Sequence, residues 1–529
     1  MTQEFDYVIV GAGSAGSALA GRLTEDPRLR VLVLEAGPNY SSSEQPAEMK
    51  SKNPFNLILP AKFQATYLWP TLMARRTGRQ APRMYWRGRG AGGSSSINGQ
   101  IAIRGVMAAF DEWAEYGAEG WSAEGVLPFF NRLEDDADFG DRPYHGIGGP
   151  TPVFRMPLSQ WGPVDLALRE AAMALGHPWA DDLNAPDASG VTTFAINIRD
   201  GRRVSVNDTY LEDARRRPNF SILGSALVDK VLWDGNSAVG VRARIGGEAR
   251  EFRASRVVLS AGAIHSPSIL LRSGVGPAGE LRKLGIPVVR DLPVGKGLFD
   301  HPFVRLELKL KSQFRPKGPD ERHTNCCVKF SSGLPGSGFN DLIFFSMNHG
   351  GFGVEGDPSM FGDAGIHVSL FECFSQGEVT LASIDPEAQP NVDLAMLSDE
   401  RDLARFRQGA RQLLQIGQHQ AVVGIAENVF AGNSGLSPAA MSGVSAPEFD
   451  DWLLTDCSDA QHGAGSCRMG AAGVPDGKSV VDPYCQVRGV ENLWIVDASV
   501  MPRDCRANTN FTTIMIGEKM ADHFRNRAR

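Results

Sequence analysis

The sequence predicts a mixed α/β protein of two domains, one built on a parallel sheet and one on an antiparallel sheet backed by helices. The chain opens with an apolar strand, a glycine-rich turn, a small-residue helix and a second apolar strand. Its texture changes near residue 304 to short strands divided by Gly, Pro and Asn, and returns to the first kind after about residue 452. Its 529 residues are also too many for one small domain.

The opening unit is an apolar strand at residues 7–10 that runs into a helix through three glycines, Gly11, Gly13 and Gly16. This G-x-G-x-x-G spacing allows a tight turn, close approach of a pyrophosphate to the backbone, and close packing of helix on strand. The helix N-terminus offers N–H groups and partial positive charge to phosphates. The second strand ends at Glu35, placed to accept hydrogen bonds from an adenosine ribose. The alternative is a glycine-rich turn without a ligand.

A second glycine-rich segment, residues 87–99, has too many small residues to pack a core of its own. It can bring backbone N–H groups close to something large, planar or anionic. A flexible linker is the alternative, but the segment leads directly into residues 101–105 and a predicted helix at 107–116. Residues 40–80 predict a long irregular excursion, of the kind that often forms a lid or covers a cofactor.

The other predicted elements follow from hydrophobic periodicity. We expect helices around 126–130 and at 163–176, 207–217, 398–418 and 512–524. We expect antiparallel strands at 220–223, 230–233, 239–244 and 249–253, and in the second domain at 304–310, 326–330, 342–347, 366–371 and 378–381. A strand at 257–262 suits the parallel sheet, another at 493–497 ends in an acid, and the acidic run at 134–138 is expected on a solvated surface.

The amino-acid composition limits which binding partners and which cellular location we expect. The net charge is −7, and there is no basic run, zinc-ligand spacing or RNA-binding signature, so we expect neither nucleic acid nor bound metal. The seven cysteines are odd in number and lack a C-x-x-C pair, which favours reduced packing thiols. We expect no signal peptide and no membrane span, since no apolar run reaches about 18–20 residues, and hence a cytoplasmic location.

Four segments together resemble the glucose–methanol–choline (GMC) oxidoreductases, which are FAD-dependent alcohol-oxidising enzymes. The segments are 87–95, 262–276, 462–470, and 496–502 leading to Asn508-Thr509-Asn510. The resemblance covers essentially the whole chain. It is to bacterial members that act on aromatic or heteroaromatic carbinols, such as furfuryl, benzyl or pyridoxine-like alcohols.

The resemblance implies a discontinuous Rossmann-like FAD-binding domain, 1–157, 206–303 and 455–529, and a substrate-binding domain, 158–205 and 304–454. The three glycines would take the pyrophosphate, Glu35 the ribose, and the Val228 backbone the adenine. Ser95 and Asn98 would lie beside the pyrophosphate and flavin, and Asp497 and Ala498 near the ribityl–phosphate part. The implied FAD-contacting set is Gly11, Gly13, Ser14, Ala15, Gly16, Glu35, Ala36, Gly93, Ser95, Asn98, Gly99, Val228, Ala261, Gly262, Asp497, Ala498, Asn508 and Thr509.

Two positions depart from the family pattern. Some members tether FAD through a histidine in the glycine-rich segment, and the matching position here is Ile97. Isoleucine cannot form that bond, so we expect noncovalent FAD. The usual Ser-Arg-Gly turn is altered to Ser375-Gln376-Gly377, with no predicted consequence.

His462 and Asn508 match the catalytic positions of the family. Alcohol oxidation requires loss of the hydroxyl proton and transfer of a hydride to flavin N5, and histidine is the natural base near neutral pH. His462 would take the proton and Asn508 would fix the alcohol oxygen. A helix N-cap is the structural alternative for Asn508. The helix that follows would point its positive end at the flavin and favour the anionic reduced form.

The other histidines carry weaker signals. His177, His419 and His523 show no sign beyond a structural role, and the family gives His265 and His301 no chemical role. The candidate substrate-pocket residues are Phe345, Met347, His349 and Phe371. The phenylalanines between 344 and 374 suit a flat ring if they line the pocket, and they are equally suited to the core.

The expected reaction is oxidation of a primary alcohol to the aldehyde, with FAD reoxidised by O₂ to give H₂O₂. A dehydrogenase that passes electrons to a quinone or another carrier is the alternative. More remote are a non-redox lyase or photodecarboxylase on the same fold, and a flavin-binding protein without catalysis. The pair His462 and Asn508 argues for alcohol chemistry.

Overall fold

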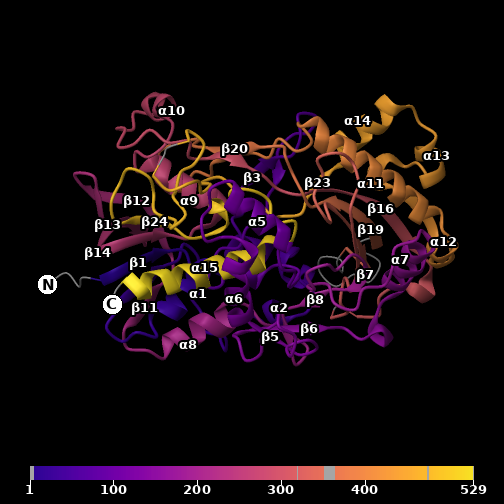
Figure 1. The fold of residues 1–529 in the computed structure, drawn as a ribbon, viewed down its shortest axis with the longest axis horizontal. Coiled ribbons are helices and arrows are strands. Elements are labelled where there is room, and N and C mark those ends of the chain that lie inside the picture. Colours follow the sequence, from indigo (N-terminus) through magenta and orange to yellow (C-terminus); the bar gives the residue numbers. More distant parts are fainter. Residues whose placement is uncertain (1–4, 319, 351–363, 474–475, 528–529) are drawn as a thin grey trace.

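The computed structural model describes residues 5–318, 320–350, 364–473 and 476–527. Within them, one seven-stranded sheet lies toward one end of the long axis and a second lies toward the other (Figure 1). The first mixes parallel and antiparallel strands, and the second is antiparallel with helices packed on it. The predicted mixed α/β class is confirmed.

The first sheet has the strand order β11-β2-β1-β14-β13-β12, with β24 beside β14. Its parallel strands are β1 (Phe5–Val10), β2 (Val31–Leu34), β11 (Phe220–Leu223), β24 (Leu493–Ile495) and the second half of β14 (Glu248–Leu259). The antiparallel extension adds β12 (Ala226–Asp234) and β13 (Ser237–Ile245). Ile9 pairs with Val33 on one side and Val258 on the other, and all three are fully buried. Burial on both faces is typical of a central parallel strand.

One strand prediction in this sheet was wrong: residues 220–223 pair parallel with β2, not in the antiparallel extension. Residues 249–253 do pair antiparallel with β13, and residues 257–259 do pair parallel with β1, but both belong to one continuous strand, β14, which ends at Leu259. In a half-exposed edge strand, buried and exposed side chains alternate whether the strand pairs parallel or antiparallel. The hydrophobic periodicity could therefore not distinguish parallel from antiparallel pairing for residues 220–223.

The strand-to-helix turn is as tight as its glycines predict. Gly11 has φ +104°, and a Cβ there would lie 2.4 Å from the Ser260 carbonyl oxygen. A Cβ on Gly16 would lie 2.1 Å from the Gly11 carbonyl oxygen. Helices of this half include α1 (Ser14–Leu23), α9 (Gly262–Arg272) and α15 (Thr509–Arg527), and α1 and α15 lie side by side (Figure 1).

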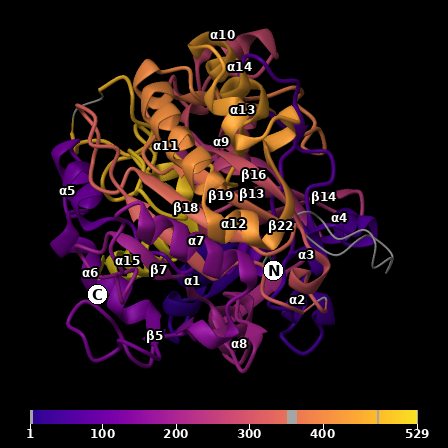
Figure 2. The same ribbon diagram turned by 90° about the vertical axis from the view of Figure 1, so that its right-hand side faces the viewer.

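The second sheet has the order β22-β16-β19-β18-β17-β7, with β23 beside β16. Its strands are β7 (Gly190–Thr193), β16 (Pro302–Leu310), β17 (Cys326–Phe330), β18 (Leu342–Met347), β19 (Ala364–Leu370), β22 (Ala426–Ala431) and β23 (Ser458–Asp459). The helices α7 (Pro163–Ala174), α11 (Glu400–Gln418) and α12 (Gln420–Ile425) pack against this sheet, in front of it in Figure 2. Strand residues therefore alternate between this helix-covered face and the opposite face.

A five-stranded sheet, β15-β20-β21-β3-β4, brings distant segments together. Its strands are β15 (Lys296–Leu298), β20 (Gly377–Thr380), β21 (Asn391–Asp393), β3 (Met73–Arg75) and β4 (Arg83–Met84). The prediction that 378–381 joins the second sheet was therefore wrong. The remaining helices of at least four residues are α2 (Ala47–Lys50), α3 (Phe55–Ile58), α4 (Ala61–Tyr67), η1 (Gly93–Ser96), α5 (Met107–Glu115), α6 (Ala123–Leu133), η3 (Asn207–Leu211), α8 (Glu212–Arg215), α10 (Ala278–Lys283), α13 (Pro438–Ser442) and α14 (Ala446–Asp456). Residues 40–80 are thus more ordered than predicted.

The prediction that the acidic run at 134–138 lies on a solvated surface was also wrong. β5 (Glu134–Asp136) pairs with β6 (Thr151–Arg155), and Glu134 and Asp136 are buried. Arg104 and Arg155 form ion pairs with them, and His145 lies between the two carboxylates. Burial costs less when each charge has a partner, and these partners come from segments that a local charge pattern does not reveal.

All seven cysteines lie in the described part of the chain, are buried and form no disulfide bond, as predicted. No helix of the described residues combines the length and the apolar character that crossing a membrane requires.

Candidate active site

A cavity of about 900 Å³ lies between the two large sheets. At one end it is lined by the carboxyl ends of the parallel strands, including Val10, Leu34 and Ser260. At the other end it is lined by the helix-free face of the second sheet, and between them by residues 458–463 and 508–510. Open α/β sheets bind their ligands at the carboxyl ends of the strands, so this is where a cofactor is expected.

Most residues of the implied FAD set line this cavity. They are Gly11, Gly13, Ser14, Ala15, Glu35, Ala36, Gly93, Asn98, Gly99, Val228, Ala261, Gly262, Asp497, Ala498, Asn508 and Thr509. Gly16 and Ser95 are not among the lining residues. Gly16 permits the helix–strand contact described above, and Ser95 Oγ donates to the Gly92 carbonyl and accepts from the Val206 N–H. Gly16 and Ser95 therefore stabilise the turns that lie behind the residues lining the cavity.

The turn that precedes α1 is open toward the cavity. A Cβ added to Gly13 would meet no atom within 4 Å. Helix α1 has no side-chain cap and no acidic residue in its first turn, so its N-terminal N–H groups and positive dipole end are available to an anion. Ser14 Oγ donates to Asn510 Oδ1 at 2.7 Å and thereby joins the starts of α1 and α15. Asn510 belongs to a motif quoted above, but its contact with Ser14 was not predicted.

Glu35, which the sequence suggests as a ribose ligand, accepts hydrogen bonds from the main chain in this structure. Its two carboxylate oxygens accept from the backbone N–H groups of Ala12, Gly37 and Gly90, at 2.9, 2.8 and 2.9 Å. The carboxylate therefore ties three turns around the cavity together. Its burial is complete enough that desolvation raises the pKa above the usual range despite the three N–H donors.

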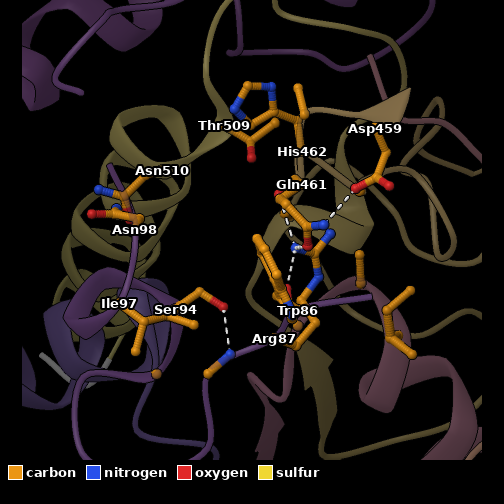
Figure 3. A pocket seen from close by; sticks show the side chains of 18 of the residues that line it. Trp86, Arg87, Ser94, Ile97, Asn98, Asp459, Gln461, His462, Thr509 and Asn510 are labelled. Atoms are coloured by element: carbon orange, nitrogen blue, oxygen red, sulfur yellow. Dashed lines mark hydrogen bonds between the residues drawn. The ribbon is translucent and has the colours of Figure 1, made fainter. Parts of the chain in front are cut away.

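His462 and Asn508 meet where the two ends of the cavity join. His462 Nε2 and Asn508 Nδ2 lie 2.9 Å apart, and both residues line the cavity. Figure 3 shows Ile97 and Asn98 on one side of the pocket and Arg87 on the other, with His462 above. Burial, the neighbouring His301 and Arg87 lower the pKa of His462 well below its ordinary value. A neutral imidazole can accept a proton, as a general base must.

Asp300 holds the loop that carries His462, a role that the sequence analysis did not find. Its Oδ1 accepts from the backbone N–H groups of His301 and His462 at 2.7 and 2.8 Å. Its Oδ2 accepts from Tyr85 Oη at 2.5 Å, and Arg87 donates to the same hydroxyl. The preceding residue, Gln461, has φ +64° and accepts from Arg87 through its main-chain and side-chain oxygens. The contacts of Asp300 with Tyr85 and with His462 join residues more than 150 positions apart, which no local pattern signals.

In the wall opposite the cofactor end, alternate side chains of the strands face the cavity. The residues of these strands that line the cavity are Phe303, Arg305 and Glu307 on β16, Ile343, Phe345 and Met347 on β18, and Gly365 and His367 on β19, with Ala364 at the start of β19 in addition. Their neighbours on the strands, such as Phe344, are buried beneath the helices. Phe345 and His367 are stacked, with ring centroids 4.5 Å apart and an interplanar angle of 7°.

Of the four candidate substrate-pocket residues, Phe345, Met347 and Phe371 line the cavity. His349 is not among the lining residues; its Nε2 lies 3.1 Å from the Glu321 carbonyl oxygen, and its ring contacts Phe55. His323 and His367 line the cavity instead, and neither was predicted from the sequence to do so. Residues 351–363, part of the aromatic stretch considered above, lie outside the described residues.

The altered turn at 375–377 contacts the motif that begins at His462. Gln376 Oε1 accepts from Arg468 Nη2 at 2.8 Å, and Arg468 belongs to the motif that begins at His462. Ser375 Oγ accepts from the Asp399 N–H at 3.0 Å, at the start of α11. The glutamine thus links this turn to the segment that follows the candidate base.

Comparisons with known proteins agree with the fold and the site. Residues 5–303 match the N-terminal GMC oxidoreductase family model, and residues 373–517 match the C-terminal one. The chain belongs to the GMC oxidoreductase family, whose members are FAD-dependent enzymes, as the motifs predicted.

Two relatives and one solved structure illustrate the relationship. The chain is 36% identical over 542 residues to 5-(hydroxymethyl)furfural oxidase of Methylovorus sp. (strain MP688), covering 98% of each chain. It is 36% identical over 566 residues to oxygen-dependent choline dehydrogenase of Pseudomonas aeruginosa (strain LESB58), covering 100% of this chain and 96% of the relative. The crystal structure of pyridoxine 4-oxidase from Mesorbium loti superposes with a TM-score of 0.87 at 28% identity, covering 99% of each chain.

The cavity fits the cofactor of the family. An uncapped helix N-terminus beside the open position at Gly13 suits a pyrophosphate. A Cβ on Gly93 would lie 2.8 Å from the Gly13 Cα, so the two glycine-rich segments touch and form one continuous wall. Asn98 and Gly99 line the same cavity as the His462–Asn508 pair, so a flavin bound along this wall would lie in the cavity that holds the candidate base.

Proposed function

We propose that this protein is an FAD-dependent oxidase of primary alcohols and that its substrates are aromatic or heteroaromatic carbinols, which it converts to aldehydes. The observation that carries the proposal is the 2.9 Å contact of His462 Nε2 with Asn508 Nδ2 at the junction of the two ends of the cavity. A hydroxyl placed there has a proton acceptor and an amide donor on the same side.

The protein's own groups supply the proton chemistry. His462 Nε2 accepts the hydroxyl proton, and the Asn508 amide donates a hydrogen bond to the oxygen as its negative charge develops. FAD, when bound, supplies the acceptor for the hydride from the carbinol carbon. Gly11, Gly13 and Ser14 would hold its pyrophosphate and Asn98 and Gly99 would lie along its flavin.

Three features support an aromatic substrate. The cavity wall carries the stacked Phe345 and His367 pair, and Phe303 lies edge-on to both. Phe371 adds an aromatic edge beside His462, with ring centroids 5.9 Å apart. Relatives named as acting on hydroxymethylfurfural and pyridoxine point the same way. Aromatic walls also attract quaternary ammonium groups, so choline is the second candidate, favoured by the choline dehydrogenase relatives.

A panel of alcohols tests the substrate class. Furfuryl, benzyl and pyridoxine-type alcohols, choline and aliphatic alcohols are mixed anaerobically with the holoenzyme, and flavin bleaching is followed. We expect the aromatic carbinols to bleach the flavin faster than choline or the aliphatic alcohols. Fast bleaching by choline alone would replace the aromatic assignment with the second candidate.

We also propose that FAD is bound noncovalently. Ile97 lines the cavity at the position where some members carry the tethering histidine, and its side chain has no nucleophile. Acid precipitation should leave a yellow supernatant and a colourless pellet. A yellow pellet would contradict the proposal.

The electron acceptor is proposed to be O₂, giving H₂O₂, with a quinone or another carrier as the alternative. Turnover in air, with H₂O₂ measured, is compared with turnover under argon with a dye acceptor. Stoichiometric H₂O₂ at a similar rate supports an oxidase, whereas turnover that requires the dye supports a dehydrogenase.

A further inference from the structure

His462 is the cavity-facing end of a hydrogen-bonded chain of three side chains. His462 Nδ1 lies 2.9 Å from His301 Nδ1, and His301 Nε2 lies 2.7 Å from Asp504 Oδ2. His301 has no exposed surface and Asp504 is 5% exposed. Phe371 stacks on the His301 ring at 4.6 Å and 28°, which fixes the plane of the imidazole.

The donors and acceptors along this chain can be arranged in one consistent direction. Asp504 accepts from the N–H groups of Cys373 and Arg506, so its carboxylate is held as an acceptor. It accepts from His301 Nε2–H, which leaves the lone pair of His301 Nδ1 facing His462. His462 must then carry its own hydrogen on Nδ1, and its Nε2 lone pair faces Asn508 and the cavity. This is the tautomer that a general base requires.

We propose that His301, oriented by Asp504, is a positioning residue for the base: it fixes the Nδ1–H tautomer of His462 and accepts the Nδ1 proton when Nε2 takes the proton of the alcohol. This inference rests on the proposed alcohol oxidation. The alcohol O–H bond breaks and an N–H bond forms at His462 Nε2, while the Nδ1–H bond of His462 breaks and an N–H bond forms at His301 Nδ1. Asp504 stays ionised throughout, so a buried imidazolium is formed next to a carboxylate rather than next to the cavity.

The charges around the pair favour His301 over His462 as the site of the proton. Burial opposes a charge on His301, but Asp504 and Asp300 outweigh it and raise its pKa above the ordinary value. Burial, His301 and Arg87 lower the pKa of His462. Asp300 is itself titratable, because burial and the neighbouring Asp459 raise its pKa to about 6. Tyr85 bonds Asp300, and Cys373 Sγ lies 3.4 Å from the Asp300 carbonyl oxygen.

The two histidines therefore titrate as one unit. When His301 is protonated, its Nδ1–H donates to His462 Nδ1, and His462 must then carry its hydrogen on Nε2, where it can no longer accept the alcohol proton. Flavin reduction in the wild-type enzyme should fall with decreasing pH through an apparent pKa above about 6.5, the ordinary histidine value.

His301→Asn and His301→Phe separate the two roles. The asparagine oxygen can accept from His462 Nδ1–H and keep its tautomer, but it cannot take the proton, whereas phenylalanine does neither. In anaerobic stopped-flow experiments on the holoenzyme, His301→Phe should reduce flavin at least about tenfold more slowly, a smaller loss than the roughly 10²–10⁴-fold expected when the base itself is removed. His301→Asn should lose less rate, and its acid limb should move to lower pH. The His177→Asn variant, which removes an imidazole packed on Phe330, is the control.

A second readout is independent of turnover. In substrate-free holoenzyme labelled with ¹⁵N-histidine, His462 should show the Nδ1–H tautomer, and His301→Phe should lose the hydrogen-bonded Nδ1–H signal. Retained FAD and thermal stability in each variant check the fold. An acid limb and rate that are unchanged in both His301 variants would overturn the inference while leaving the proposed function intact. A His462→Ala enzyme that reduces at the wild-type rate would instead overturn the proposed function.

Discussion

The two ends of the cavity differ in the groups that form them: mainly main-chain groups at one end and side chains at the other. The cofactor end is made of backbone: glycines, helix N-termini, and a carboxylate, Glu35, that accepts three main-chain N–H groups. The alcohol end is made of side chains that reach one another from distant segments, such as His301, His462 and Asp504. Backbone contacts tolerate side-chain changes nearby, whereas a side-chain network fails when one member is removed. Substitutions at the two ends should therefore change different measurements.

The largest expected effect is at the alcohol end. His462→Ala should keep its yellow cofactor, because the candidate phosphate and ribose contacts lie elsewhere. Flavin reduction by alcohol should slow by at least about 10²-fold, the usual scale of general-base catalysis. Anaerobic stopped-flow reduction across pH measures both the rate and the acid limb.

Asn508→Ala is the matched comparison. It should also slow reduction, but it should keep the acid limb, since an amide does not titrate in this range. A His462→Ala enzyme with the wild-type rate and limb would show that the base is elsewhere.

Two neighbouring phenylalanines on β18 test whether the wall of the alcohol end is a substrate surface. Phe344 is fully buried and stacks on Phe330 at 4.5 Å, whereas Phe345 faces the cavity. Phe344→Ala should lower the free energy of unfolding by about 3–5 kcal/mol, the usual cost of a large core truncation.

Phe345→Ala should lower that free energy by less and should raise KM for aromatic alcohols by roughly tenfold, which corresponds to about 1.4 kcal/mol of lost contact. Thermal unfolding and steady-state kinetics of both variants separate the two effects. Equal KM changes in the two variants would mean that Phe345 acts only through packing.

The same contrast explains what the sequence could predict. Contiguous signals predicted residues that lie together at one end of the cavity: Gly11, Gly13, Glu35 and parts of the segment at 496–510 all line it. His462 and Asn508 were found through motifs, but Asp504, 203 positions from His301, was not. Likewise the acidic run at 134–138 gave no sign of Arg104 and Arg155. Periodicity predicts which face a residue takes, and only the tertiary fold brings partners from distant segments together.

At the cofactor end, Glu35→Gln tests the carboxylate. Glutamine keeps the size but turns one acceptor into a donor, which would face backbone N–H groups. Charge-assisted hydrogen bonds contribute about 1.5–3 kcal/mol each, so FAD affinity should fall at least about tenfold and the apo protein should unfold at lower temperature.

Occupancy at limiting FAD and thermal unfolding of the apo form measure the two parts of this prediction. Glu44→Ala, which removes an exposed carboxylate that bonds Ser41, is the control and should change neither. Unchanged apo stability with weaker FAD binding would mean that Glu35 acts mainly through the ribose.

The smallest expected effect is at Asn510, which accepts from Ser14 Oγ at 2.7 Å. Asn510→Ala removes one neutral hydrogen bond between the starts of α1 and α15. A bond of this kind contributes about 0.5–1.5 kcal/mol net, so FAD affinity should fall only a few-fold, while the rate of flavin reduction by alcohol in the saturated enzyme stays unchanged. Asn526→Ala is the matched control, since Asn526 lies on the same helix, is exposed and bonds only Asp522 among the described contacts. Because backbone groups dominate the cofactor end, a large loss of FAD in Asn510→Ala would contradict the contrast between the two ends.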